Sequence, residues 1–177
     1  MSSQRVVGAA RASRALARRE IDTPLGPMSA FASDRGLRAL LFEGSDPAAE
    51  RVYGDGEDGR GSEVLRACSE QLEAYFCGVL RRFDLPLDPV GTAFQRQAWA
   101  ALQQIPYGET WSYAQQASSI GRPSAARAIG AANGRNPLAI IVPCHRVVGA
   151  SGALTGFAGG LDKKRALLEL EGARVAR

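Results

Sequence analysis

The spacing of hydrophobic residues changes at Pro89, Val90 and Gly91, and this change limits the folds open to the chain. Before this point apolar residues stand mostly in short runs between turn sequences, which is typical of strands. After it they recur every three or four residues, as on one face of a helix. Because 177 residues can form two small domains, we interpret these three residues as a linker between them.

Residues 20–88 are expected to form an α/β domain with a small antiparallel sheet and one helix. Two apolar runs, at 28–32 and 37–42, flank an Asp-Arg-Gly turn, which predicts a hairpin or meander. After a loop rich in glycine and acids at 54–61, a helix with a glycine stop is predicted from the spacing of Val64, Leu65, Cys68, Leu72, Tyr75, Phe76 and Gly78. Alternating apolar residues at 83–87 predict a closing strand.

Residues 92–172 are expected to form a mainly helical domain. The first helix has an apolar stripe made of Phe94, Ala98, Trp99, Leu102 and Ile105. Ser112 and Gln115 have the form of a capping box and open a second helix, which Gly121 closes. A third helix is expected at 124–132, so the last two helices match a helix-turn-helix. Helical hairpins are also common in proteins that bind no DNA.

Basic charge is concentrated in the C-terminal half. Residues 110–161 contain no acid, yet they include Arg122, Arg127, Arg135 and Arg146. Between positions 46 and 88 acids outnumber basic residues, although the whole chain carries a formal charge of +4. A basic face binds a polyanion by neutralising phosphates and releasing counterions. The charge pattern therefore favours DNA binding, and a cationic surface kept for solubility is the alternative.

Residues 1–19 contain five arginines and no acid, and we expect a disordered tail here. Arg11, Arg14 and Arg18 would share one face of a helix, which leaves a DNA-contacting arm or an organelle transit peptide as alternatives. The chain has no run of about 18 apolar residues that could span a membrane. We therefore expect a cytoplasmic protein without a membrane partner.

The three cysteines are interpreted as reduced thiols, because an odd number cannot all pair. A zinc site is not expected, since Cys68 and Cys77 stand nine positions apart and His145 is the only histidine. Cys68 lies on the apolar face of a predicted helix and is assigned to the core. Cys144 differs, because it follows an apolar run at 138–142 that predicts a buried strand.

Cys144 and His145 form the candidate chemical centre. The thiolate is the reactive form of cysteine, and a neighbouring imidazole or cation can lower the pKa of a thiol. Adjacent residues on an extended segment point in opposite directions, so we expect His145 to reach the sulfur through a water molecule. An inert buried cysteine beside a satisfied histidine is the alternative that the two residues alone leave open.

A longer pattern surrounds this pair. Ile-Val-Pro-Cys-His-Arg-Val-Val-Gly at 141–149 is followed by Thr-Gly-Phe-Ala-Gly-Gly at 155–160 and preceded by Asn-Gly-Arg-Asn-Pro at 133–137. With these motifs the chain resembles the O6-alkylguanine-DNA alkyltransferase (methylated-DNA–protein-cysteine methyltransferase) family from about residue 94 to 172, while the N-terminal half matches only in layout. The resemblance implies an RNase H-like first domain and a second domain with a winged helix-turn-helix.

The resemblance also implies which residues react. Cys144 would be the acceptor that attacks the alkyl carbon in line, and His145 would deprotonate it through a bound water. Glu171 would orient the histidine, and Asn136 would hold the active-site turn together. The implied reaction needs neither metal nor cofactor. Each molecule would act once, because the thioether product has no good leaving group.

The implied partner is double-stranded DNA containing O6-alkylguanine, with O4-alkylthymine as a further possible substrate, bound by a monomer. Tyr113 would contact the flipped base, and Arg127 would fill the vacated stack. The backbone of Val147 and Ala158 would hydrogen-bond guanine. The family usually has tyrosine where this chain has Phe157, so we expect slower transfer.

Two other functions are compatible with parts of the pattern. A lesion-binding protein of the same shape would flag alkylguanine without repairing it, but relatives of that kind lack the cysteine. A cysteine hydrolase would use Cys144 and His145 to cleave an amide or ester. It would regenerate its thiol, whereas an alkyl acceptor consumes it.

Overall fold

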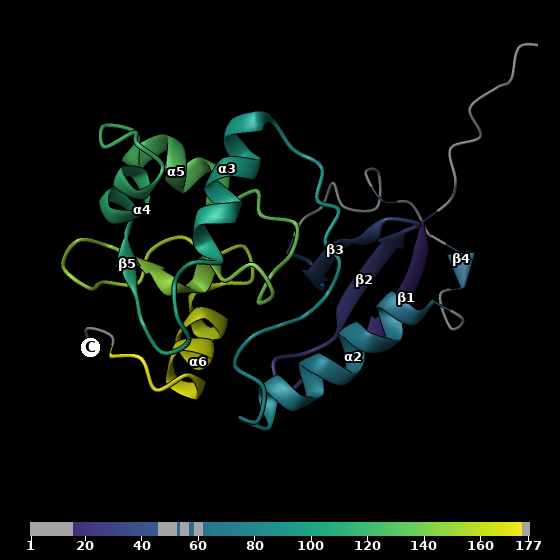
Figure 1. Cartoon of the computed structure of the whole chain (residues 1–177). Coiled ribbons are helices and arrows are strands. Elements are labelled where there is room, and N and C mark those ends of the chain that lie inside the picture. Colours follow the sequence, from purple (N-terminus) through teal and green to yellow (C-terminus); the bar gives the residue numbers. More distant parts are fainter. Residues whose placement is uncertain (1–15, 46–52, 54–56, 59–61, 175–177) are drawn as a thin grey trace, which may run out of the picture.

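The computed structural model describes residues 16–45, 53, 57–58 and 62–174. The predicted disordered tail lies outside the described residues, apart from its last four positions. Figure 1 shows a sheet and a long helix on one side of the molecule and a group of shorter helices on the other. No helix in the described part of the chain is long and apolar enough to cross a membrane.

The first domain is built on a four-stranded sheet in the order β3-β2-β1-β4. Strands β1 (Ala17–Ile21), β2 (Met28–Ser33) and β3 (Gly36–Phe42) pair antiparallel, which confirms the hairpin or meander predicted for the runs at 28–32 and 37–42, while β4 (Glu57–Asp58) is parallel to β1. Helix α2 (Glu63–Phe76), also as predicted, lies against the three long strands. Its buried face consists of Leu65, Cys68, Leu72 and Tyr75.

Two predictions for this domain are wrong. The tail was expected to reach residue 19, but β1 begins at Ala17. The arginines in this segment led to the prediction of a tail. In the structure Arg18 donates a hydrogen bond to Ser29 and lies over the ring of Phe31, so its charge is compatible with a position in the sheet. The second error is the closing strand at 83–87, which makes a single bridge to the described part of the domain, from Leu87 to Leu37. Pro86 has no N–H and cannot continue a ladder.

The second domain contains the three predicted helices and a fourth that ends it. In chain order its elements are α3 (Ala93–Leu102), β5 (Trp111–Ser112), α4 (Tyr113–Ser119), α5 (Ala126–Asn133), the 3-10 helix η2 (Cys144–Arg146), β6 (Val147–Val148) and α6 (Leu161–Leu170). The predicted capping box of Ser112 and Gln115 is present, and α4 with α5 forms the helix-turn-helix. The first helix ends at Leu102, and Ile105 is buried beyond it.

The two domains share one hydrophobic core. Side chains of the sheet and of α2 pack in the same cluster as residues of the second domain, including Leu102, Ile105, Leu138 and Leu167. The backbone also crosses the boundary, because Leu40 of β3 donates to the carbonyl of Pro137 and accepts from the amide of Ala139. The segment that leads to Cys144 is therefore held directly against the sheet.

Candidate functional site

The segment before Cys144 is a buried turn, so the strand predicted at 138–142 is wrong. Val142 donates to the carbonyl of Leu138, and Ile140 has a positive φ of 70°. Asn136 supports the turn, because its side chain accepts from the amide of Leu138 at 3.0 Å and donates to the carbonyl of Val142 at 2.7 Å. A continuous apolar run fits a buried turn as well as a buried strand, and the side-chain hydrogen bonds of Asn136 favour the turn here.

Cys144 begins the 3-10 helix that follows this turn and keeps part of its surface open to solvent. Its Sγ accepts a hydrogen bond from Nδ2 of Asn136 at 3.3 Å. The surrounding protein removes water from the sulfur and so raises the pKa of the thiol, and this effect outweighs the hydrogen bond from Asn136 and the charge of Lys164. The resting sulfur is therefore protonated.

His145 is fully buried, and its Nε2 lies 2.8 Å from Oε1 of Glu171. Burial alone would raise the pKa of Glu171, but hydrogen bonds from His145 and Arg146 hold it well below its usual range. Because an ionised carboxylate only accepts, Nε2 must carry the imidazole proton and Nδ1 must present a lone pair. That Nδ1 is buried and has no hydrogen-bond partner among the described residues.

The protonation state of His145 follows from burial. Desolvation lowers the pKa of His145 more than the contact with Glu171 raises it. The imidazole is therefore neutral at pH 7 and can accept a proton. A protonated thiol is thus followed in the chain by a neutral base, and no described residue occupies the nitrogen of that base that can accept a proton.

Glu171 collects more donors than the sequence indicated. Arg146 donates through Nε at 2.8 Å and Nη2 at 2.9 Å, Gly108 through its amide at 3.2 Å, and Tyr75 through its hydroxyl at 2.7 Å. Arg146 is only 7% exposed, so its inclusion in the basic DNA-binding face is wrong. Arg122, Arg127 and Arg135 are exposed, and their place in such a face stays a prediction.

Lys164 is a further buried charge that sequence reasoning missed. Its Nζ donates to the carbonyls of Val147 at 2.6 Å, Thr155 at 2.7 Å and Gly156 at 3.3 Å, and burial lowers its pKa to about 8. The sequence spacing could have indicated its burial, because Lys164 stands three and four positions before Leu167 and Leu168 and so lies on the same buried face of α6. The lysine ties β6 to the loop that precedes Phe157.

The remaining predicted residues surround this loop. The ring of Phe157 packs edge-on against Phe42 of β3, with centroids 6.1 Å apart. Ala158 is exposed and lines a cavity of about 500 Å³ together with Asn136. Val147 already uses its amide to cap η2 and its carbonyl to bind Lys164. Val147 is also fully buried, so the contact of its backbone with guanine stays a prediction.

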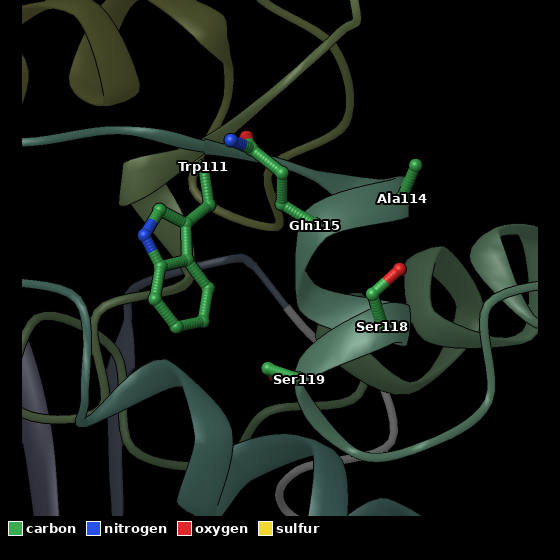
Figure 2. Close-up of a pocket in the computed structure, with 5 residues that line it drawn as sticks. All are labelled: Trp111, Ala114, Gln115, Ser118 and Ser119. Carbon is green, nitrogen blue, oxygen red and sulfur yellow. The ribbon is translucent and has the colours of Figure 1, made fainter.

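The predicted DNA-contacting residues lie on the helix-turn-helix. Tyr113 begins α4 and its hydroxyl donates to the carbonyl of Thr155 at 3.2 Å. Arg127 is exposed in the first turn of α5. A separate open depression of about 620 Å³ lies beside α4, where Figure 2 shows the indole of Trp111 on the side of the helix toward which Gln115 and Ser119 extend. None of the predicted site residues lines it.

Comparison with protein families gives two matches that together cover both domains. The model of the 6-O-methylguanine DNA methyltransferase ribonuclease-like domain matches residues 17–89, and that of the DNA binding domain of the same family matches residues 93–173. The similarity therefore extends through the N-terminal half, where the sequence motifs indicated only a common layout.

Individual relatives cover nearly the whole chain. A methylated-DNA–protein-cysteine methyltransferase from Methanosarcina acetivorans is 50% identical over 151 residues, covering 85% of this chain and 95% of its own. The enzyme of the same name from Mycobacterium tuberculosis is 50% identical over 157 residues, covering 89% and 93%.

Solved structures agree with these sequence comparisons. The Mycobacterium tuberculosis O6-methylguanine methyltransferase has a TM-score of 0.80 at 48% identity, with 91% of this chain and 95% of that chain covered. The protein from the same organism solved in complex with DNA has a TM-score of 0.78 at 49% identity, with 88% and 92% covered. Because both domains match the family and relatives share about 50% of their residues with this chain, the chain belongs to the O6-methylguanine DNA methyltransferase family.

Proposed function

We infer that this protein repairs O6-alkylguanine in DNA by transferring the alkyl group to Cys144. The observation that carries the assignment to this residue is the pairing of a thiol held by Asn136 with a neutral His145 whose proton sits on the nitrogen facing Glu171. This arrangement can generate a thiolate on demand, in a chain whose family performs alkyl transfer. The product is a thioether, so one molecule reacts once.

In the proposed reaction His145 Nδ1 removes the thiol proton through an intervening water. The new imidazolium is stabilised by the ionised Glu171, and the new thiolate by Asn136 and the charge of Lys164. The thiolate then attacks the alkyl carbon in line with the bond to guanine O6. The S–C bond forms as the C–O bond breaks, and the electron pair passes to guanine, which takes up a proton.

The helix-turn-helix supplies the DNA contacts in this proposal. The target nucleotide must leave the base stack before Cys144 can reach it, at a cost of a few kcal/mol. Arg127 on α5 is exposed and is the proposed side chain that fills the vacated stack. Tyr113, at the start of α4, is fixed by Thr155 beside the loop of Phe157 and would contact the flipped base. O4-alkylthymine remains a proposed secondary substrate.

Intact-mass measurement tests the function directly. The protein is incubated with a duplex oligonucleotide that contains one O6-methylguanine, and peptide mapping locates the modification. We expect one added methyl group per molecule, on Cys144, with an equal amount of repaired guanine. Repair of several oligonucleotides by one protein molecule would refute single-use transfer, and an unmodified protein with unrepaired DNA would refute the function.

Replacing Arg127 by alanine is expected to weaken binding to O6-methylguanine duplexes about tenfold, because about 1.4 kcal/mol of compensation for base flipping is lost. Binding of both proteins should fall steeply with added salt, since phosphate contacts release counterions. Arg165, exposed on α6, provides the control of equal charge, R165A. Equal losses in the two variants, measured by fluorescence anisotropy, would show that Arg127 contributes only charge.

Phe157→Tyr is expected to speed alkyl transfer by about ten- to a hundredfold, with little change in DNA affinity. The added hydroxyl would donate to guanine O6 as negative charge grows there, and such a bond contributes about 1–3 kcal/mol mainly in the transition state. Single-turnover rates at saturating DNA measure the change. An equal or slower rate would show that the pocket already supplies another donor to O6.

A further inference from the structure

Tyr75 belongs to the first domain but reaches the proton-relay residues of the second. It lies on α2, is fully buried, and donates through its hydroxyl to Oε1 of Glu171, a residue 96 positions later in the chain. The same oxygen is bound by Nε2 of His145 at 2.8 Å. Tyr75 and His145 therefore share one acceptor atom.

Three aromatic rings pack against Tyr75 and help to fix its position. Its ring centroid lies 5.4 Å from those of Phe76 and Phe83 and 6.1 Å from that of Tyr107. Burial, and after it the neighbouring charge of Glu171, raises the pKa of Tyr75 far above its usual value. The hydroxyl thus stays protonated and acts as a permanent donor.

We propose that Tyr75 is a positioning residue for alkyl transfer, which fixes the Glu171 carboxylate and limits how strongly this carboxylate attracts a proton onto His145. The inference rests on the proposed function. It means that the first domain takes part in the proton transfer between Cys144, His145 and Glu171. The titratable and charged groups around the imidazole are Glu171, Arg146, Lys164, Cys144 and, through Glu171, Tyr75. Of these, Tyr75 alone comes from the first domain.

The physical reason is competition for charge. Each donor to Oε1 neutralises part of the carboxylate charge that would otherwise stabilise an imidazolium. Removing the Tyr75 hydroxyl leaves more charge for His145 and raises the pKa of the imidazole. Since only neutral imidazole can accept the thiol proton, the fall of the transfer rate at acid pH then begins at a higher pH.

Tyr75→Phe tests the proposal, because it removes the hydroxyl and keeps the ring. The matched control is Tyr107→Phe, whose hydroxyl belongs to the same aromatic cluster but donates to the carbonyl of Leu170. His145 is the only histidine in the chain, so its pKa and tautomer can be followed by NMR without ambiguity. Single-turnover transfer to an O6-methylguanine duplex is measured across the same pH range.

We expect Tyr75→Phe to raise the pKa of His145 and to shift the acidic limb of the rate profile upward with it. Transfer should also slow about fivefold at its plateau, because without the hydroxyl the Glu171 carboxylate holds the imidazole less firmly in place. Tyr107→Phe should leave the pKa and the limb in place. A folded Tyr75→Phe protein with an unchanged histidine pKa and rate profile would overturn the inference. If the unmodified protein transfers no methyl group at all, the proposed function fails instead, and the NMR titration still tests the coupling.

Discussion

Replacing Cys144 by serine is expected to abolish alkyl transfer and to leave DNA binding intact. The serine hydroxyl is nearly the same size but is a far weaker acid than a thiol, so the neutral His145 cannot convert it to a nucleophile. The DNA contacts proposed for Arg127 and Tyr113 lie on α4 and α5 and do not involve the sulfur. Binding should therefore stay within a factor of about two, a change of only about 0.4 kcal/mol.

The remaining cysteines provide the controls for this experiment. Cys77 is exposed and Cys68 is buried, with desolvation raising the pKa of Cys68 to about 12. Cys77→Ser should transfer one methyl group like the unmodified protein, with unchanged rate. Intact mass and anisotropy measure the two properties separately. A methyl group found on Cys77, or residual transfer by Cys144→Ser, would show that the acceptor has been assigned wrongly.

Local signals allowed most of the secondary structure to be predicted from sequence. The capping box of Ser112 and Gln115 and the apolar face of α2 involve residues close in the chain, and both are present in the structure. The strand predicted at 138–142 was wrong because all five residues are apolar, and this pattern is the same in a buried turn as in a buried strand. The deciding contact is the side chain of Asn136, which no hydrophobic pattern reports.

The reacting pair could be found from sequence, but its electrostatics could not. Cys144 and His145 are adjacent, whereas the residues that set their charge states come from distant parts of the chain. Arg146 looked like a DNA-binding charge, and only the fold shows that it is buried against Glu171. For the same reason sequence could not give the direction in which the thiol pKa moves, because it shows neighbouring cations but not the loss of water around the sulfur.

Glu171→Gln is expected to slow alkyl transfer by at least about a hundredfold. If the substitution fully reverses the histidine tautomer, the loss should reach about ten-thousandfold. Gly108 N–H and Arg146 Nε face one carboxylate oxygen and can only donate. At the other oxygen only Arg146 Nη2 is an obligate donor, because Tyr75 and His145 can accept there instead. The glutamine oxygen therefore leaves fewer donors opposed when it faces Gly108, and its amide N–H₂ then faces His145. The imidazole then accepts at Nε2 and carries its proton on Nδ1, where it can no longer deprotonate Cys144.

The same substitution should also lower the free energy of unfolding by about 3–5 kcal/mol, because buried Arg146 loses its anionic partner. In the unmodified protein the depressed pKa of Glu171 stabilises the fold above the unfolded value of about 4.3, and this contribution is lost as pH falls below it. Urea unfolding should therefore show a smaller loss of stability on acidification in Glu171→Gln. The control is Glu169→Gln, an exposed position on α6.

Transfer by Glu171→Gln within tenfold of the unmodified rate would exclude the tautomer argument, and NMR of the single histidine would show which nitrogen carries the proton.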